Sequence, residues 1–279
     1  MFKNLSLIEM VEILSEKEYD LPILSETYKK CLEMYEKNGL EQDIFEIINI
    51  ALKDPFLSLK LLFKISRKKR TSIDLEINSI KKTLMMLGFK EFFDIVLSSS
   101  VIMEHEGLNI SIKRCQYATE KAKEFAERRN DILPEEVQLT TLLADLGELI
   151  LWTYKPEIPK KIRECMLIKQ YNRNQEAQIA LCGFKFKDLS YQLAKKWYLP
   201  EPIIELMESV NSSRALISKY CINTSRHIYE KDGYLAIPDD IRDLKNQTNQ
   251  SILEIYQIMD IKNLLNDKEN QYIKNSLHI

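Results

Sequence analysis

The side chains that most often hold metal ions or perform acid–base catalysis are sparse in this chain. Its 279 residues include three histidines, His105, His227 and His278. None of them precedes an aspartate, and no two lie one helical turn apart. A binuclear metal hydrolase needs several imidazole and carboxylate groups converging on one point, because each metal–ligand bond is only about 2 Å long. The sequence therefore predicts no catalytic residues, no metal and no other cofactor.

Other motifs that carry chemistry also argue against an enzyme. There is no phosphate-binding glycine loop and no GxSxG elbow. The cysteines are odd in number and form no CxxC pair, which argues against a zinc knuckle or a disulfide framework. We expect them to be reduced, mostly buried thiols: Cys31, Cys115, Cys165, Cys182 and Cys221.

One short basic run could contact a phosphate group or an acidic partner. It consists of Arg67, Lys68, Lys69 and Arg70. The plainer interpretation is a solvated helix end, because cations are favourable near the negative C-terminus of a helix. Both interpretations stay open on the sequence alone.

The elements that must position these residues are predicted to be helices throughout. Apolar residues recur at spacings of three and four, and the chain has only 6 glycines and 8 prolines. We expect one helix over 134–154, one that begins near Ser111, and a stop at Gly88. Asp54 and Pro55 have the residue types of an N-cap and a first helical position.

The polar stretch 104–109 predicts a boundary between two helical lobes. The N-terminal lobe covers 1–105 and the C-terminal lobe covers 106–266, followed by a polar, frayed tail over 267–279. The net charge of −2, from 40 basic and 42 acidic residues, argues against a nucleic-acid partner. The chain shows no signal peptide and no apolar run long enough to span a bilayer, so we expect a cytoplasmic protein.

Four segments resemble, in the same order, motifs of the HDOD family, the "HD-related output domain" proteins of bacterial signalling. They are ALKDPFLSLKLLFKIS from Ala51, the helical segment Ile77–Ser100, LLADLGELIL at Leu142–Leu151, and a stretch that ends in KKWYLPEPI at Lys195–Ile203. Together they cover roughly residues 20 to 230. We interpret the matched positions as structural: Asp54, Pro55, Gly88, Gly147, Glu176, Gly183, Trp197, Leu199 and Pro200.

The resemblance also implies a second lobe that is a degenerate HD domain. Where the parent HD hydrolases carry a His-Asp dyad, this chain has Ala144-Asp145. The family's next histidine aligns with Phe186, and its later paired histidines fall near Val210-Asn211. Asp145 would then be an isolated carboxylate that caps a helix, pairs with a lysine or faces water, and that cannot hold a catalytic metal alone.

The resemblance implies an all-α, two-lobed HDOD-like domain with a non-catalytic role. Such a protein would act as a signalling adaptor through protein–protein interaction, linked to cyclic-di-GMP, chemotaxis or two-component pathways. The alternatives are a metal-dependent HD-type phosphohydrolase and a regulator that binds a nucleotide ligand in the vestigial pocket. Bound metal and hydrolysis would identify the first alternative, and titration with nucleotides the second.

Overall fold

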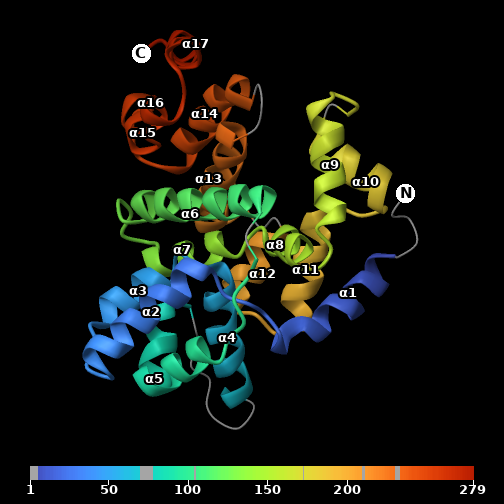
Figure 1. Ribbon diagram of the computed structural model, residues 1–279. Helices are drawn as coiled ribbons and strands as arrows, with labels where there is room; N and C mark the ends of the chain where they lie inside the picture. Colours follow the sequence, from blue (N-terminus) through green and yellow to red (C-terminus); the bar gives the residue numbers. More distant parts are fainter. Residues whose placement is uncertain (1–5, 70–77, 104, 172, 209–210, 230–232) are drawn as a thin grey trace.

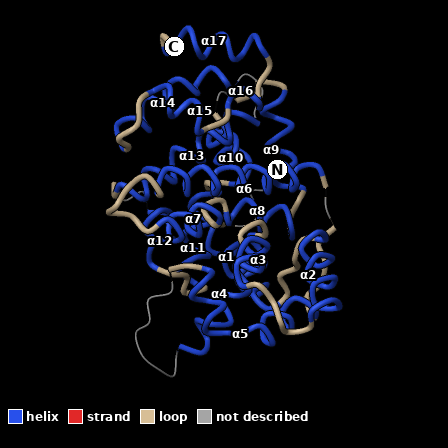
Figure 2. The backbone as a smooth tube through the Cα atoms, turned by 90° about the vertical axis from the view of Figure 1, so that its left-hand side faces the viewer, coloured by secondary structure: helices blue, strands red, loops and turns tan. Residues whose placement is uncertain are grey.

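The computed structural model describes residues 6–69, 78–103, 105–171, 173–208, 211–229 and 233–279, and it is helical throughout them (Figures 1 and 2). Within these ranges, β-type pairing is limited to one isolated parallel bridge between Ile23 and Val101. The all-α fold predicted from the spacing of apolar residues is therefore confirmed. Among the described helices, none has the length and apolar character that a bilayer crossing requires.

The helices follow one another with short connections. The first group is α1 (Leu7–Ser15), the 3-10 helix η1 (Glu16–Tyr19), α2 (Ser25–Asn38), α3 (Ile44–Ala51), α4 (Pro55–Lys69) and α5 (Ile80–Leu97). The second is α6 (Glu106–Ala126), α7 (Pro134–Leu142), α8 (Leu146–Tyr154), α9 (Glu157–Leu167), α10 (Asn174–Cys182), α11 (Phe186–Lys196) and α12 (Glu201–Glu208). The third is α13 (Ser213–Tyr229), η2 (Gly233–Ala236), α14 (Ile237–Gln247), α15 (Ile252–Ile258), α16 (Ile261–Leu264) and α17 (Asp267–Leu277).

Helix α6 lies between two hydrophobic cores. Figures 1 and 2 show it between the group α2–α5 and the group α14–α17. Its first half gives Leu108 and Ile112 to a larger core, which also takes side chains from α1–α5 and α8–α12. Its second half gives Ala122 and Phe125 to a smaller core built with α13–α17. The larger core draws on both expected lobes, and the boundary at 105/106 stays a prediction.

Two helix starts near α6 and α8 differ from the expectation. Helix α6 begins at Glu106 and not near Ser111, because the ring of His105 caps it by accepting from the Leu108 N–H at 3.3 Å. The single helix expected over 134–154 is interrupted between α7 and α8. The hydroxyls of Thr140 and Thr141 both donate to the Val137 carbonyl, a side-chain bond that competes with the helix ladder and bends helices.

The expectation of a frayed tail is also wrong. Asn266 caps α17 together with Glu269, each side chain accepting from the other's backbone N–H. Ile273 and Leu277 are buried in the smaller core. The tail therefore has a capped helix with one apolar stripe, which its overall polarity obscured.

Two other sequence signals are confirmed. The buried Asp54 carboxylate accepts from the N–H groups of Phe56 and Leu57 and so caps α4, which begins at Pro55. Gly88 interrupts α5 with φ +78° and ψ 163°, a conformation essentially restricted to glycine.

Candidate functional site

Asp145 lies in the turn between α7 and α8, where two arginines reach its carboxylate. Its Oδ2 accepts from Nη2 of Arg114, on α6, at 3.2 Å. Its Oδ1 accepts from Nη2 of Arg226, on α13. Asp145 and Arg114 are both buried, whereas the Arg226 side chain keeps 37% of its surface exposed. The expected isolated carboxylate is therefore wrong: Asp145 is paired with two cations.

A second carboxylate completes the group. Glu148, on the first turn of α8, accepts from Nη2 of Arg114 at 3.0 Å through Oε2. Its Oε1 accepts from the Ser111 hydroxyl at 2.7 Å and from the Trp152 indole N–H at 3.4 Å. We call Arg114, Asp145, Glu148 and Arg226 the arginine–carboxylate cluster. Its two positive and two negative charges balance, which is the condition for burying ionised groups at moderate cost.

The cluster keeps Asp145 ionised. Burial acts to raise the pKa of this carboxyl, but the charges of Arg226 and Arg114 and their hydrogen bonds outweigh burial and hold the pKa below its ordinary value. An ionised carboxylate between two permanently charged guanidinium groups has no proton to exchange near neutral pH. The arrangement is suited to linking α6, α8 and α13, and not to general acid or base catalysis.

The histidines lie in structural positions. His105 caps α6, and its Nε2 lies 3.2 Å from the Trp152 carbonyl. Nδ1 of His227 lies 2.7 Å from Asp240 Oδ2. His278 ends α17. In the part of the chain that the structure describes, no three or more His, Cys, Asp or Glu side chains gather in a way that could hold a metal ion.

A cavity of about 160 Å³ adjoins the cluster. Arg114 and Glu148 line it on one side, and the apolar side chains of Ile110, Ile162 and Phe186 line it elsewhere. Phe186, the residue that aligns with a histidine of the HD hydrolases, therefore lies in the same cavity wall as the cluster. The vestigial residues are brought together in space, with Arg114 as the link between them.

The remaining residues singled out in the sequence lie in varied surroundings. Gly147 lets α8 approach α11, because a Cβ there would lie 2.5 Å from the Phe186 carbonyl oxygen. Gly183 ends α10 with φ +86°, and Glu176 is exposed on the same helix. The buried Trp197 donates to the Ser15 carbonyl at 3.0 Å.

Three more positions complete this survey. Ala144 is half-buried against the smaller core, and Leu199 and Pro200 connect α11 to α12. The side chains of the basic run lie outside the described residues: Arg67, Lys68, Lys69 and Arg70.

Sequence reasoning missed Arg114, Glu148 and Arg226. One signal was available, since Glu148 follows Asp145 at a spacing of three, which places the two carboxylates on one helix face. The arginines carried no such signal. Arg114 and Arg226 are 31 and 81 positions from Asp145, so only the tertiary fold brings them to it.

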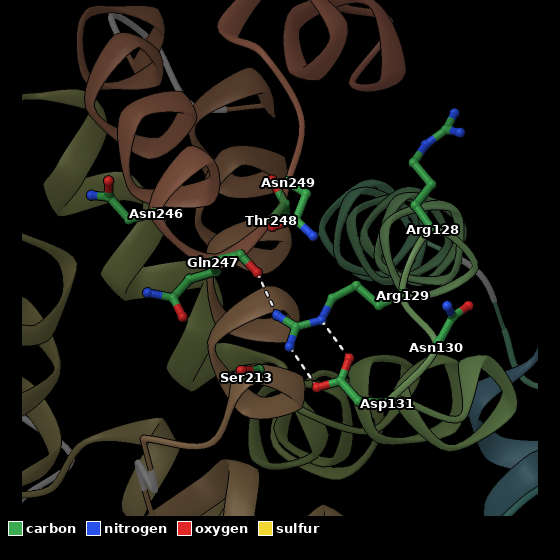
Figure 3. Close-up of a pocket in the computed structure, with 9 residues that line it drawn as sticks. All are labelled: Arg128, Arg129, Asn130, Asp131, Ser213, Asn246, Gln247, Thr248 and Asn249. Carbon is green, nitrogen blue, oxygen red and sulfur yellow. Dashed lines mark hydrogen bonds and ion pairs between the residues drawn. The ribbon is translucent and has the colours of Figure 1, made fainter.

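A second hollow, of about 410 Å³, lies where α6 and α14 end (Figure 3). Arg129 spans it, donating to both carboxylate oxygens of Asp131 at 2.9 and 2.6 Å and to the Gln247 carbonyl at 2.7 Å. Its donors thus satisfy a carbonyl at the α14 end, as helix C-termini require. We interpret this feature as a clasp between two helix ends.

Comparison with known proteins identifies related folds. The family model described as HDOD domain matches residues 21–213. The MmoQ response regulator from Methylococcus capsulatus str. Bath is similar in structure, with 14% identity, a TM-score of 0.67, and coverage of 86% of this chain and 98% of its own. A virulence factor from Campylobacter jejuni subsp. jejuni has 18% identity and a TM-score of 0.70, with coverage of 93% and 98%. No curated protein matches the chain.

Proposed function

Because this chain belongs to the HDOD family, we propose that it is a non-catalytic signalling module that works by binding protein partners. The family relates it to signalling proteins, and a response regulator is among the structures with a similar fold. The pathway it serves is one in which a helical surface receives or passes on a signal by contact.

The observation that carries the proposal is the arginine–carboxylate cluster. A hydrolase of the HD type would need the oxygens of Asp145 as metal ligands, and both already accept from guanidinium groups. A divalent cation at that position would have to displace both groups against their positive charge. Arginine cannot release its charge by losing a proton, so the obstacle does not titrate away.

The cavity dimensions weigh against the alternative of a nucleotide-binding regulator. Sites for drug-sized ligands and cofactors measure about 300–1,000 Å³. The cavity beside the cluster measures about 160 Å³. A nucleotide would therefore have to leave much of its surface outside.

We also propose that the protein works in a reducing compartment such as the cytoplasm. All five cysteines are buried free thiols. Burial raises the pKa of the Cys31 thiol to about 12 and that of Cys182 to about 11, which keeps both in the unreactive protonated form.

The absence of catalysis is tested with metal and substrate. Purified protein is incubated with Mn²⁺ or Fe²⁺, dialysed, and assayed by elemental analysis and by hydrolysis of cyclic-di-GMP and bis-p-nitrophenyl phosphate. We expect metal far below one equivalent and turnover at the level of buffer. Stoichiometric metal together with hydrolysis would contradict the proposal.

The binding role is tested by capture from the native cell with a tagged chain, followed by reconstitution with purified components. We expect at least one partner that binds the purified chain directly. A chain that captures no direct partner under cross-linking conditions would exclude the adaptor role.

A further inference from the structure

The cavity beside the cluster opens onto exposed apolar surface at the end of α9. Met166 and Leu167 line the cavity, and Ile168 follows them as the residue that ends the helix. Leu167 is 56% exposed and Ile168 is 74% exposed. Large aliphatic side chains in contact with water next to a cavity are typical of a surface that another molecule covers.

The size of the cavity limits what enters it. A cavity of about 150 Å³ lined by apolar side chains is known to admit one benzene ring. The cavity here is about 160 Å³, so it takes one ring or one large apolar side chain. An occupant that also covers Leu167 and Ile168 must be larger than the cavity, and it therefore enters with only a part of itself.

The polar side of the cavity is held rigidly. The Ser111 hydroxyl and an Nη2 group of Arg114 are engaged by Glu148, and both residues are more than nine-tenths buried. Side chains fixed in this way keep the cavity open and shaped in advance, which lowers the cost of binding. The apolar walls of Ile110, Ile162 and Phe186 then supply the contact area.

The charge around this surface is strongly positive. The segment 155–174, which contains α9, has six basic residues against two acidic ones, although the whole chain has a net charge of −2. The basic residues are Lys155, Lys160, Lys161, Arg163, Lys169 and Arg173. An apolar anchor point surrounded by cations is complementary to an apolar side chain flanked by Asp and Glu.

We propose that this surface, the α9 cavity, binds a segment of a protein partner that inserts one Leu, Phe or Trp side chain and carries acidic residues beside it. The inference rests on the proposed function and locates its interface. A single buried anchor surrounded by weaker polar contacts is the usual energetic pattern of such surfaces.

The test uses the full chain and three variants. Ile110→Trp fills the cavity from a half-buried position, and Leu167→Asp places a negative charge on its rim. Leu253→Asp is the matched control, since Leu253 is a 50% exposed leucine on α15, a helix that contributes nothing to the cavity. Circular dichroism and thermal unfolding confirm that each variant folds before binding is measured.

The probe is a displayed library of random peptides of about 16 residues, selected on the wild-type chain. We expect enriched peptides with a large apolar residue flanked by Asp or Glu. Ile110→Trp and Leu167→Asp should each weaken their binding about 10-fold or more, and Leu253→Asp should leave it unchanged within about twofold. Raising NaCl from about 50 to about 300 mM should weaken binding by screening the acidic flanks.

Several outcomes would overturn the α9 cavity as an interface. They are a library without enrichment, peptides that bind Ile110→Trp as well as wild type, and binding to phosphatidylglycerol vesicles but to no peptide. Failure here is distinguishable from failure of the proposed function. If native partners bind the wild type and both cavity variants equally, the interface lies elsewhere and the adaptor role stands.

Discussion

The arginine–carboxylate cluster decides how the vestigial site is interpreted at the scale of single residues. A buried carboxylate is costly unless cations compensate it, and here Arg114 and Arg226 supply that compensation. The two guanidinium groups thereby occupy the carboxylate that the HDOD resemblance places at a metal-ligand position. A structural role for Asp145 follows, because the energy of its burial depends on both partners.

The two arginines should differ in their contribution to stability. Arg114→Met should lower the free energy of unfolding by about 3–5 kcal/mol, because it leaves two buried carboxylates without their shared partner. Arg226→Met should cost about 1 kcal/mol, since the partly exposed Arg226 shares its work with water. Urea unfolding measures both, with the exposed Arg242→Met as control. Equal losses for Arg114 and Arg226 would contradict the burial argument.

The cluster should also give stability a specific dependence on pH. The pKa of Asp145 is lowered in the folded chain, so the folded state binds this proton less readily than the unfolded state, whose value is about 3.9. The stabilisation is therefore fully present above about pH 4 and is lost as the pH falls through the folded pKa.

This dependence is measured by urea unfolding of wild type and Asp145→Asn between about pH 7 and about pH 3. The difference between the two in free energy of unfolding should be constant near neutral pH and should shrink below about pH 4. Asp239→Asn, at an exposed aspartate paired with Arg242, is the control. A difference that grows with acidification would contradict the prediction.

At the scale of elements, side chains at helix ends connect helices that are distant in sequence. Asp54 caps α4 and in addition accepts from the Leu24 N–H at 2.8 Å, immediately before α2. One buried carboxylate therefore fixes the ends of two helices. The Asp-Pro pair of the HDOD resemblance has its physical basis in this double use.

Removing this cap should cost more than removing an ordinary one. Asp54→Ala leaves three backbone N–H groups without their acceptor in a buried region, and should lower the free energy of unfolding by about 3–5 kcal/mol. Asp43→Ala, at the exposed cap of α3, removes one bond and should cost about 1 kcal/mol. Denaturant unfolding of both variants checks the ratio. Similar losses would show that the contact with Leu24 adds nothing.

At the scale of the whole molecule, two cores share α6 and are joined across it by the cluster. Arg114 comes from α6 and Arg226 from α13, and both contact Asp145 between α7 and α8. Residues beyond the matched region 21–213 form most of the smaller core, including α14–α17. The C-terminal helices are therefore an integral part of this fold.

The docked C-terminal helix provides a direct test. Ile273→Ala should lower the free energy of unfolding by about 2–4 kcal/mol, because Ile273 is fully buried in the smaller core. Lys268→Ala, on the exposed side of α17, should change it by less than about 0.5 kcal/mol. Hydrogen exchange should show protected amides in α17. A frayed tail would show neither the loss nor the protection.

The sequence alone determined the features that depend on near neighbours. Helical periodicity, the Asp54-Pro55 start and the break at Gly88 follow from the backbone preferences of a few adjacent residues, and the structure confirms each. The order of the motifs also led to the family, because that order is written along the chain.

Tertiary structure alone decided what Asp145 does. Its partners are distant in sequence, and the turn that presents it replaces a helix that local periodicity predicted to be continuous. The burial of α17 was decided in the same way, since a polar amphipathic segment is helical only when another surface covers its apolar stripe. Charge pairing and burial act through space, and a linear pattern records neither until the chain has folded.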